Sequence, residues 1–221
     1  METQILPETR RKQGLTLIEL MVVLAVLLFM VALFYPQVHR RPAVRSPRIA
    51  CVNNLKQIGI AYRTFAIDNR DCFPMQTPLT NGGTLELAAF APTYVHFQAM
   101  SNELTIPKIL LCPAETHRTA ATNFGPDLDN ARISYFVGID ANQTNSQMFL
   151  SGDRNLTNGR ASNRRFLDLT TNNPVGWTAE LHQSQGNAGL ADGSVQQFNN
   201  SRLREALANT GDSTNRLAMP Y

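Results

Sequence analysis

The segment from Leu15 to Tyr35 constrains the fold most strongly, because apart from Thr16 and Glu19 its side chains are apolar or aromatic. A helix of this length, rising about 1.5 Å per residue, can cross a hydrocarbon core of about 30 Å. The sequence therefore predicts a membrane helix near the N-terminus. Glu19 needs an explanation, because a carboxylate costs about 2.5–3.5 kcal/mol at the centre of a membrane helix and less near its end.

A cleaved signal peptide explains this segment poorly. Basic residues Arg10, Arg11 and Lys12 precede it, as in a signal peptide. However, its apolar stretch is longer than the usual length of roughly 7–15 residues, and no small-x-small cleavage site follows. We therefore expect the helix to stay on the protein. The positive-inside rule does not fix its orientation, because arginines also follow the segment.

The charge of the chain gives no sign of a nucleic-acid partner. The chain has 221 residues and a formal net charge of +3, which is too small to indicate a nucleic-acid-binding surface. Arg160, Arg164 and Arg165 gather in a polar region. Arginines in such a region usually form a solvated surface. We expect one globular domain after the apolar segment and no nucleic acid bound to it.

The residues before and after Leu15 resemble the class III signal of type IV prepilins and type II secretion pseudopilins. The resemblance rests on Arg-Arg-Lys-Gln-Gly at residues 10–14, followed by Leu-Thr-Leu-Ile-Glu-Leu and the apolar helix. It implies that a prepilin peptidase cuts after Gly14 and methylates the new amino terminus of Leu15. Leu15 stands where phenylalanine is commoner in the family.

The resemblance also implies a role for Glu19, the fifth residue after the cut. In a filament its carboxylate would meet the positive terminal amine of a neighbouring subunit, which offsets part of the desolvation cost. An alternative from position alone is that Glu19 reaches toward the membrane interface. The implied partners are the prepilin peptidase, other pilin or pseudopilin subunits and an inner-membrane assembly platform.

A second resemblance lies near the C-terminus. His182 is followed after nine residues by Asp192-Gly193, which is similar to the H-x9-DG signature of prepilin-like proteins from environmental bacterial phyla. The segments CVNNLKQIGIAYRTFAIDNRDCFP, from Cys51, and LLCPAE, from Leu110, are similar to the same group. Between about residues 74 and 100 the sequence resembles nothing in it.

The pattern after the apolar segment predicts an α+β, pilin-like fold, in which a long N-terminal helix with a transmembrane first half packs on an antiparallel β-sheet. Apolar residues recur at helical spacing and predict a helix from Pro47 to about Asp68; they are Val52, Leu55, Ile58, Tyr62 and Phe65. Short β-favouring runs start at residues 132, 147 and 164.

Two further elements are predicted near the C-terminus. Asp192-Gly193 between apolar runs predicts a β-hairpin with a two-residue turn and positive φ at both residues. A short helix over about residues 202–209 is expected to follow Ser201 as its cap. Residues 116–130 and 155–163 are polar and are expected to form surface loops.

Four parts follow from these expectations: a leader at residues 1–14, a transmembrane helix at 15–36, a linker and amphipathic helix at 37–70, and a globular β-rich domain with the H-x9-DG segment at 71–221. In this arrangement the protein crosses the bacterial cytoplasmic (inner) membrane once. Its N-terminus is cytoplasmic before processing, and its globular domain is periplasmic or otherwise extracytoplasmic.

The three cysteines are too few and too far apart for a zinc site of paired Cys-x-x-Cys type. A Cys72–Cys112 disulfide is a candidate if the domain is exported, and free thiols are the alternative. His182, Asp153 and Asp192 could hold calcium. A hydrogen-bonded histidine and a turn-forming aspartate explain the same residues without a metal. We expect no metal and no cofactor.

No catalytic motif accompanies these residues. Ser184 lies near His182, but the sequence has no Gly-x-Ser-x-Gly element and no nucleotide-binding motif. We therefore expect a structural subunit that polymerises into a type II secretion pseudopilus or a type IV pilus-like filament, and no catalytic residues. The alternative is a membrane-tethered, extracytoplasmic binding module that is processed but does not polymerise.

Overall fold

The computed structural model describes residues 16–38, 47–159 and 165–221, with side chains up to residue 32 in the first range. The chain divides into two compact units, Met1–Val44 and Arg45–Tyr221. The expected leader and most of the expected linker lie outside the described residues, as do Arg160 and Arg164.

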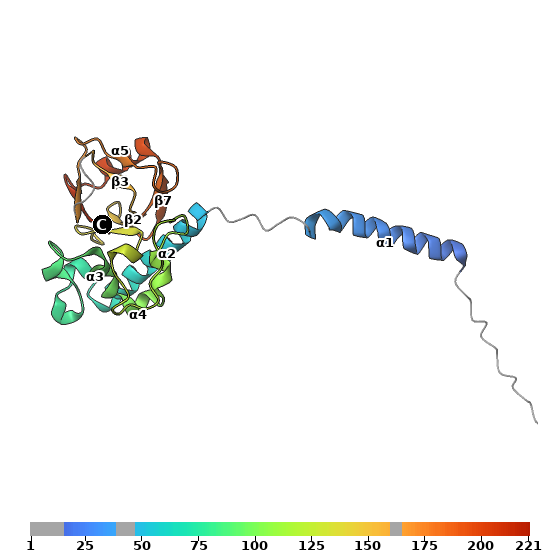
Figure 1. Cartoon of the computed structure of the whole chain (residues 1–221), viewed down its shortest axis with the longest axis horizontal. Helices are drawn as coiled ribbons and strands as arrows, with labels where there is room; N and C mark the ends of the chain where they lie inside the picture. The colour runs from blue at the N-terminus through green and yellow to red at the C-terminus, as the bar shows by residue number, and fades with distance from the viewer. Residues whose placement is uncertain (1–15, 39–46, 160–164) are drawn as a thin grey trace, which may run out of the picture. The chain divides into compact units, whose positions relative to one another are not determined.

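Helix α1 (Leu17–Val38) is the described element of the first unit (Figure 1). Its large apolar side chains are exposed from Leu17 to Val31 on every side of the helix. Among the residues that the structure describes, no helix is both long and apolar enough to cross a membrane.

Helix α2 (Pro47–Asp68) confirms the predicted helix of the second unit at both ends. Leu55, Ile58, Tyr62 and Phe65 are buried as the spacing predicted, whereas Val52 is half-buried and Cys51 is fully buried. This face of α2 packs on strands β2 and β6, so the periodicity marks the side that meets the sheet.

A six-stranded sheet with antiparallel pairing forms the centre of the second unit, in the order β4-β8-β1-β2-β6-β7. The predicted β-favouring runs correspond to β1, β2 and β4, while β8 was not predicted and lies between β4 and β1. The strands are β1 (Tyr135–Gly138), β2 (Phe149–Asp153), β4 (Phe166–Leu169), β6 (Gly186–Leu190), β7 (Val195–Phe198) and β8 (Asn215–Ala218).

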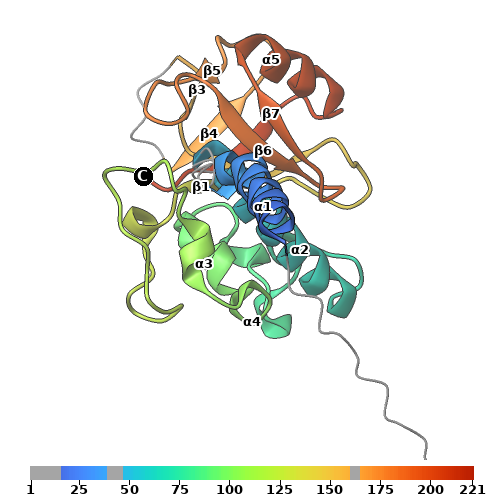
Figure 2. The same cartoon turned by 90° about the vertical axis from the view of Figure 1, so that its right-hand side faces the viewer.

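The sheet is a middle layer between two apolar cores. Tyr135 and Val137 of β1 face the core that contains α2, whereas Phe136 between them faces the core that contains α5 (Asn200–Asn209). Figure 2 shows α2 and α5 on opposite faces of the sheet. A strand covered on both faces has no solvent side, which is why all four residues of β1 are buried.

Short helices occupy the stretch between α2 and β1, which includes the region of about residues 74–100 where the sequence resembled nothing, so the expected β-rich character begins only at β1. Several of them contact α2 and contribute side chains to the core that contains α2. They are η1 (Pro74–Gln76), η2 (Leu79–Asn81), η3 (Leu85–Leu87), α3 (Thr93–Gln98), α4 (Ser101–Leu104), η4 (Pro107–Leu110) and η5 (Asn130–Arg132).

The end of the chain differs from the expectation in two details. Helix α5 begins at Asn200, and its cap is Asn199, whose side chain accepts a hydrogen bond from the backbone N–H of Arg202. Ser201 therefore lies inside the helix and does not cap it. Strand β3 (Leu156–Thr157) lies within the region expected to be a loop, and it forms a second, two-stranded sheet with β5 (Gly176–Trp177).

Candidate functional site

The start of α1 is fixed by a reciprocal pair of hydrogen bonds between Thr16 and Glu19. The backbone N–H and the hydroxyl of Thr16 donate to Glu19 Oε2 at 3.1 and 3.0 Å, and the N–H of Glu19 donates to Thr16 Oγ1 at 3.4 Å. Threonine before the helix and glutamate three residues later form a capping box. The Thr-x-x-Glu spacing was visible in the sequence, but its capping function was missed.

The second unit contains a disulfide between Cys51 and Cys112, so both the candidate Cys72–Cys112 bridge and the alternative of three free thiols are wrong. The Cα atoms of the bonded pair are 5.2 Å apart. Cys51 lies in the first turns of α2, and Cys112 follows η4, which packs on α2. Cys72 is free and follows the other end of α2 at Asp68, which lies about 26 Å along the helix from Cys51. Cys112 cannot reach both.

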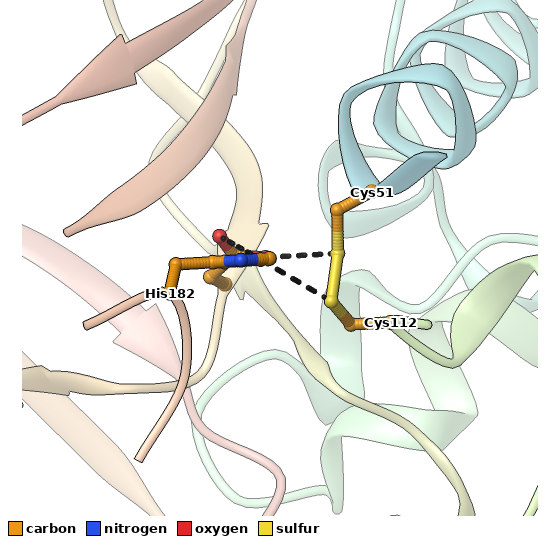
Figure 3. Close-up of side chains that lie close together, drawn as sticks. Cys51, Cys112 and His182 are labelled. Carbon is orange, nitrogen blue, oxygen red and sulfur yellow. Dashed lines mark hydrogen bonds and ion pairs between the residues drawn. A yellow bond between two sulfur atoms is a disulfide. The ribbon is translucent and has the colours of Figure 1, made fainter. Parts of the chain in front are cut away.

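Two buried side chains from other elements adjoin this disulfide (Figure 3). His182 Nε2 lies 3.3 Å from Cys112 Sγ and 3.4 Å from Asp153 Oδ2. Asp153, at the end of β2, also accepts hydrogen bonds from the backbone N–H and the side-chain amide of Asn187, at 2.7 and 2.8 Å. Helix α2, the segment after η4, β2 and the loop before β6 therefore meet at one point.

Burial controls the ionisation of this cluster. It raises the pKa of Asp153 to about 7, against the opposing effect of the Asn187 hydrogen bonds. It also lowers the pKa of His182, an effect that the positive charge of nearby Arg48 increases. Near neutral pH the histidine is therefore largely uncharged, and its 3.4 Å contact with Asp153 is not a full ion pair.

The Asp192-Gly193 hairpin between β6 and β7 exists, but its turn has three residues instead of two. The N–H of Leu190 donates to the carbonyl of Ser194, and the N–H of Gly193 donates to the carbonyl of Leu190. Gly193 has a φ of 82°, whereas Asp192 is not in the positive-φ region. Asp192 Oδ1 instead accepts from the N–H of Ser194 at 2.8 Å, which holds the turn closed.

The comparisons with known proteins identify the N-terminal region. Residues 9–35 match the family model described as the prokaryotic N-terminal methylation motif. The chain carries a prepilin-like signal. The motif indicates a structural, pilin-type protein and not an enzyme. Neither the comparison with curated proteins nor that with solved structures found a match.

The structure of this prepilin-like chain separates the residues of the H-x9-DG segment. His182 lies against the disulfide, while Asp192 and Gly193 form the hairpin turn beside α2. Of the three acidic and histidine candidates for a metal, Asp153 and His182 come together and Asp192 does not. Gly14 and Leu15 lie outside the described residues.

Valine in place of Gly193 is expected to lower the free energy of unfolding by more than about 1 kcal/mol, because a β-branched residue resists a φ of 82°. The new Cβ would also lie 3.0 Å from Arg63 Nε. Gly193→Asn is the matched control, since asparagine tolerates this backbone conformation better. Urea unfolding of the full chain in detergent measures the free energy of unfolding of both variants. An equal loss of stability in the valine and asparagine variants would contradict the assigned turn.

Proposed function

We propose that the chain is a pilin-like or pseudopilin-like structural subunit. A prepilin peptidase cuts it after Gly14 and methylates Leu15, and the processed chain assembles into a type II secretion pseudopilus or a type IV pilus-like filament. The match of residues 9–35 to the N-terminal methylation motif carries this proposal. Other pilin-type subunits and an inner-membrane assembly platform are the partners that such assembly requires.

The side chains of α1 support an assembly role. A helix that is apolar on every side needs an apolar environment, which lipid or neighbouring helices provide. The proposal therefore anchors the processed N-terminal helix in the cytoplasmic membrane and places the globular unit outside it. In a filament the same apolar surface would pack against the α1 helices of other subunits.

Glu19 is proposed to set the contact between subunits. Within the described residues, Thr16 engages one carboxylate oxygen of Glu19, Oε2. The carboxylate is exposed and carries a second oxygen, Oε1, that can accept from another chain. After processing, the methylated amine of Leu15 in a neighbouring subunit would be the cationic partner, and burial between helices would strengthen this pairing.

A membrane-tethered binding module that never polymerises is the second candidate. It is favoured by an open surface hollow of the globular unit whose lining includes Arg118, Arg154, Glu180 and Tyr221. Arg154 is held there by Glu180, at 2.5 Å, and by Glu115, at 2.8 Å. A charged, preformed hollow of this kind suits a polar ligand such as a glycan or an exported peptide.

Intact mass and N-terminal sequencing of membrane-extracted protein test the proposed processing. In cells with an active prepilin peptidase, the mature chain should begin with N-methylated Leu15 and lack residues 1–14. Gly14→Val should block the cut, because a β-branched side chain crowds the cleavage site. Cells without the peptidase are the control and should yield the uncut chain. Recovery of the uncut chain from peptidase-containing cells, or a cut after Tyr35, would refute the assignment.

A further inference from the structure

Four potential metal ligands converge around the disulfide, and Figure 3 labels three of them, Cys51, Cys112 and His182. They are Cys51, Cys112, Asp153 and His182, and their ligand atoms all lie within 4.8 Å of one another. Among the residues that the structure describes, no other group of three or more cysteine, histidine and acidic side chains brings its ligand atoms together in this way. Cys51, Cys112 and Asp153 are fully buried.

The spacing of these atoms suits a tetrahedral ion. In a zinc site with Zn–S near 2.3 Å and Zn–N or Zn–O near 2.0–2.2 Å, neighbouring ligand atoms lie about 3.3–3.8 Å apart. Cys112 Sγ lies 3.3 Å from His182 Nε2, which lies 3.4 Å from Asp153 Oδ2. Cys51 Sγ lies 3.7 Å from Asp153 Oδ1. With Asp153 Oδ2 as the single carboxylate donor, two edges of the tetrahedron are thus already close to their final length, and the two sulfurs move apart when the disulfide is reduced.

The chemistry of the donors also favours zinc. Two thiolates and an imidazole favour Zn²⁺ over Ca²⁺ and Mg²⁺, because these last two ions prefer oxygen ligands. The carboxylate of Asp153 completes a set of four ligands. Four protein ligands leave no open position, so the site would be structural and not catalytic. Its ligands come from four separate segments, so an ion there would cross-link α2, the segment after η4, β2 and the loop before β6.

The surroundings supply what a buried zinc site needs. Asn187 donates two hydrogen bonds to Asp153 and so fixes the orientation of its carboxylate. Zn²⁺ with two thiolates and one carboxylate has a net charge of −1. Arg48, which hydrogen-bonds Gln185 and lies 3.5 Å from Asn187 Oδ1, places a positive charge beside it. This charge balance lowers the cost of burying the site.

We propose that Cys51, Cys112, Asp153 and His182 bind one Zn²⁺ ion when the two cysteines are reduced, and that the Cys51–Cys112 disulfide is the oxidised form of the same site. A dithiol supplies the two electrons and two protons that convert the disulfide into two thiols, and is itself oxidised to a disulfide. Zinc binding then releases both thiol protons to solvent. The inference is independent of filament assembly, because it concerns the globular unit.

The test reduces the full chain, purified in detergent, under nitrogen with a dithiol in the presence of Zn²⁺ or Co²⁺. After the reductant and unbound metal are removed, we expect one metal ion per chain. The Co²⁺ form should show the visible bands of a tetrahedral site and thiolate-to-metal charge transfer. The chain that keeps its disulfide should retain no metal. A reduced chain that retains none, or an oxidised chain that retains as much, would overturn the proposal.

Matched variants locate the ion. Cys112→Ser and His182→Ala should lose the bound metal, whereas Cys72→Ser and Asp192→Asn should keep it, because these last two residues lie outside the cluster. Loss of metal in Cys72→Ser equal to that in Cys112→Ser would overturn the assignment. If a ligand variant does not fold, two other measurements decide: the number of metal ions bound by the wild-type chain and the spectrum of the Co²⁺ form of Cys72→Ser. Absence of thiolate-to-metal charge transfer in Cys72→Ser would refute the site.

Discussion

Replacing Glu19 with glutamine is expected to abolish self-association of the processed chain while leaving cleavage and membrane insertion intact. Glutamine preserves the capping-box hydrogen bond to Thr16 but removes the negative charge that would pair with a neighbour's terminal amine. Glu19→Ala should also fail to associate. Glu19→Lys should be worse still, because it places a positive charge against that amine.

Thr16→Ala is the matched control for this prediction. It removes the capping partner and costs about 0.5–2 kcal/mol of helix stability, but it keeps the charge of Glu19. The Thr16→Ala chain should therefore still associate. If Thr16→Ala fails to associate and Glu19→Gln succeeds, then Glu19 acts through helix capping and not through an ion pair between subunits.

Disulfide cross-linking between chains that each carry two cysteines, introduced at different positions along α1, measures this association in the membrane. The free Cys72 is first replaced by serine, so that every cross-linked ladder arises from the introduced residues. A ladder in the wild type that disappears in Glu19→Gln supports pairing. Ladders of equal strength in both chains refute the pairing role, and no ladder in the wild type favours the membrane-tethered binding module.

Alanine in place of Gly138 should lower the free energy of unfolding by about 3 kcal/mol or more. A Cβ at this position would clash with the backbone carbonyl oxygen of Phe149 in the adjacent strand β2. A backbone atom cannot rotate aside as a side chain can. Because β1 is paired with β2 on one edge and β8 on the other, relief of the clash requires central strands to move apart.

Gly189→Ala is the control for that prediction. Gly189 belongs to β6 of the same sheet, but a Cβ there would lie no closer than 3.5 Å to any neighbour, which is ordinary van der Waals contact. We expect this variant to change the free energy of unfolding by less than about 1 kcal/mol. Urea unfolding of both full-length variants gives the comparison. Equal stability of the two would show that β1 and β2 are not as closely paired as described.

Elements that depend on nearby residues were predicted well from the sequence. The α2 face was visible because residues three and four apart share one side of a helix. The apolar segment gave α1, and the Asp-Gly pair gave the β6–β7 hairpin. Two local details were nevertheless wrong. The turn has an extra residue, and Asn199 caps α5 in place of Ser201, because two polar residues so close together compete for the same role.

The sequence by itself determined the prepilin-like N-terminus, the α+β class and the position of α2, because each depends on composition or spacing within one short segment. The tertiary structure alone decided that β8 enters the sheet between β4 and β1, and that Cys51 rather than Cys72 meets Cys112. It also brought Asp153 to His182. These contacts join residues that are far apart in the chain. Whether each contact forms depends on how α2 and the strands pack against one another, and no local sequence pattern encodes that packing.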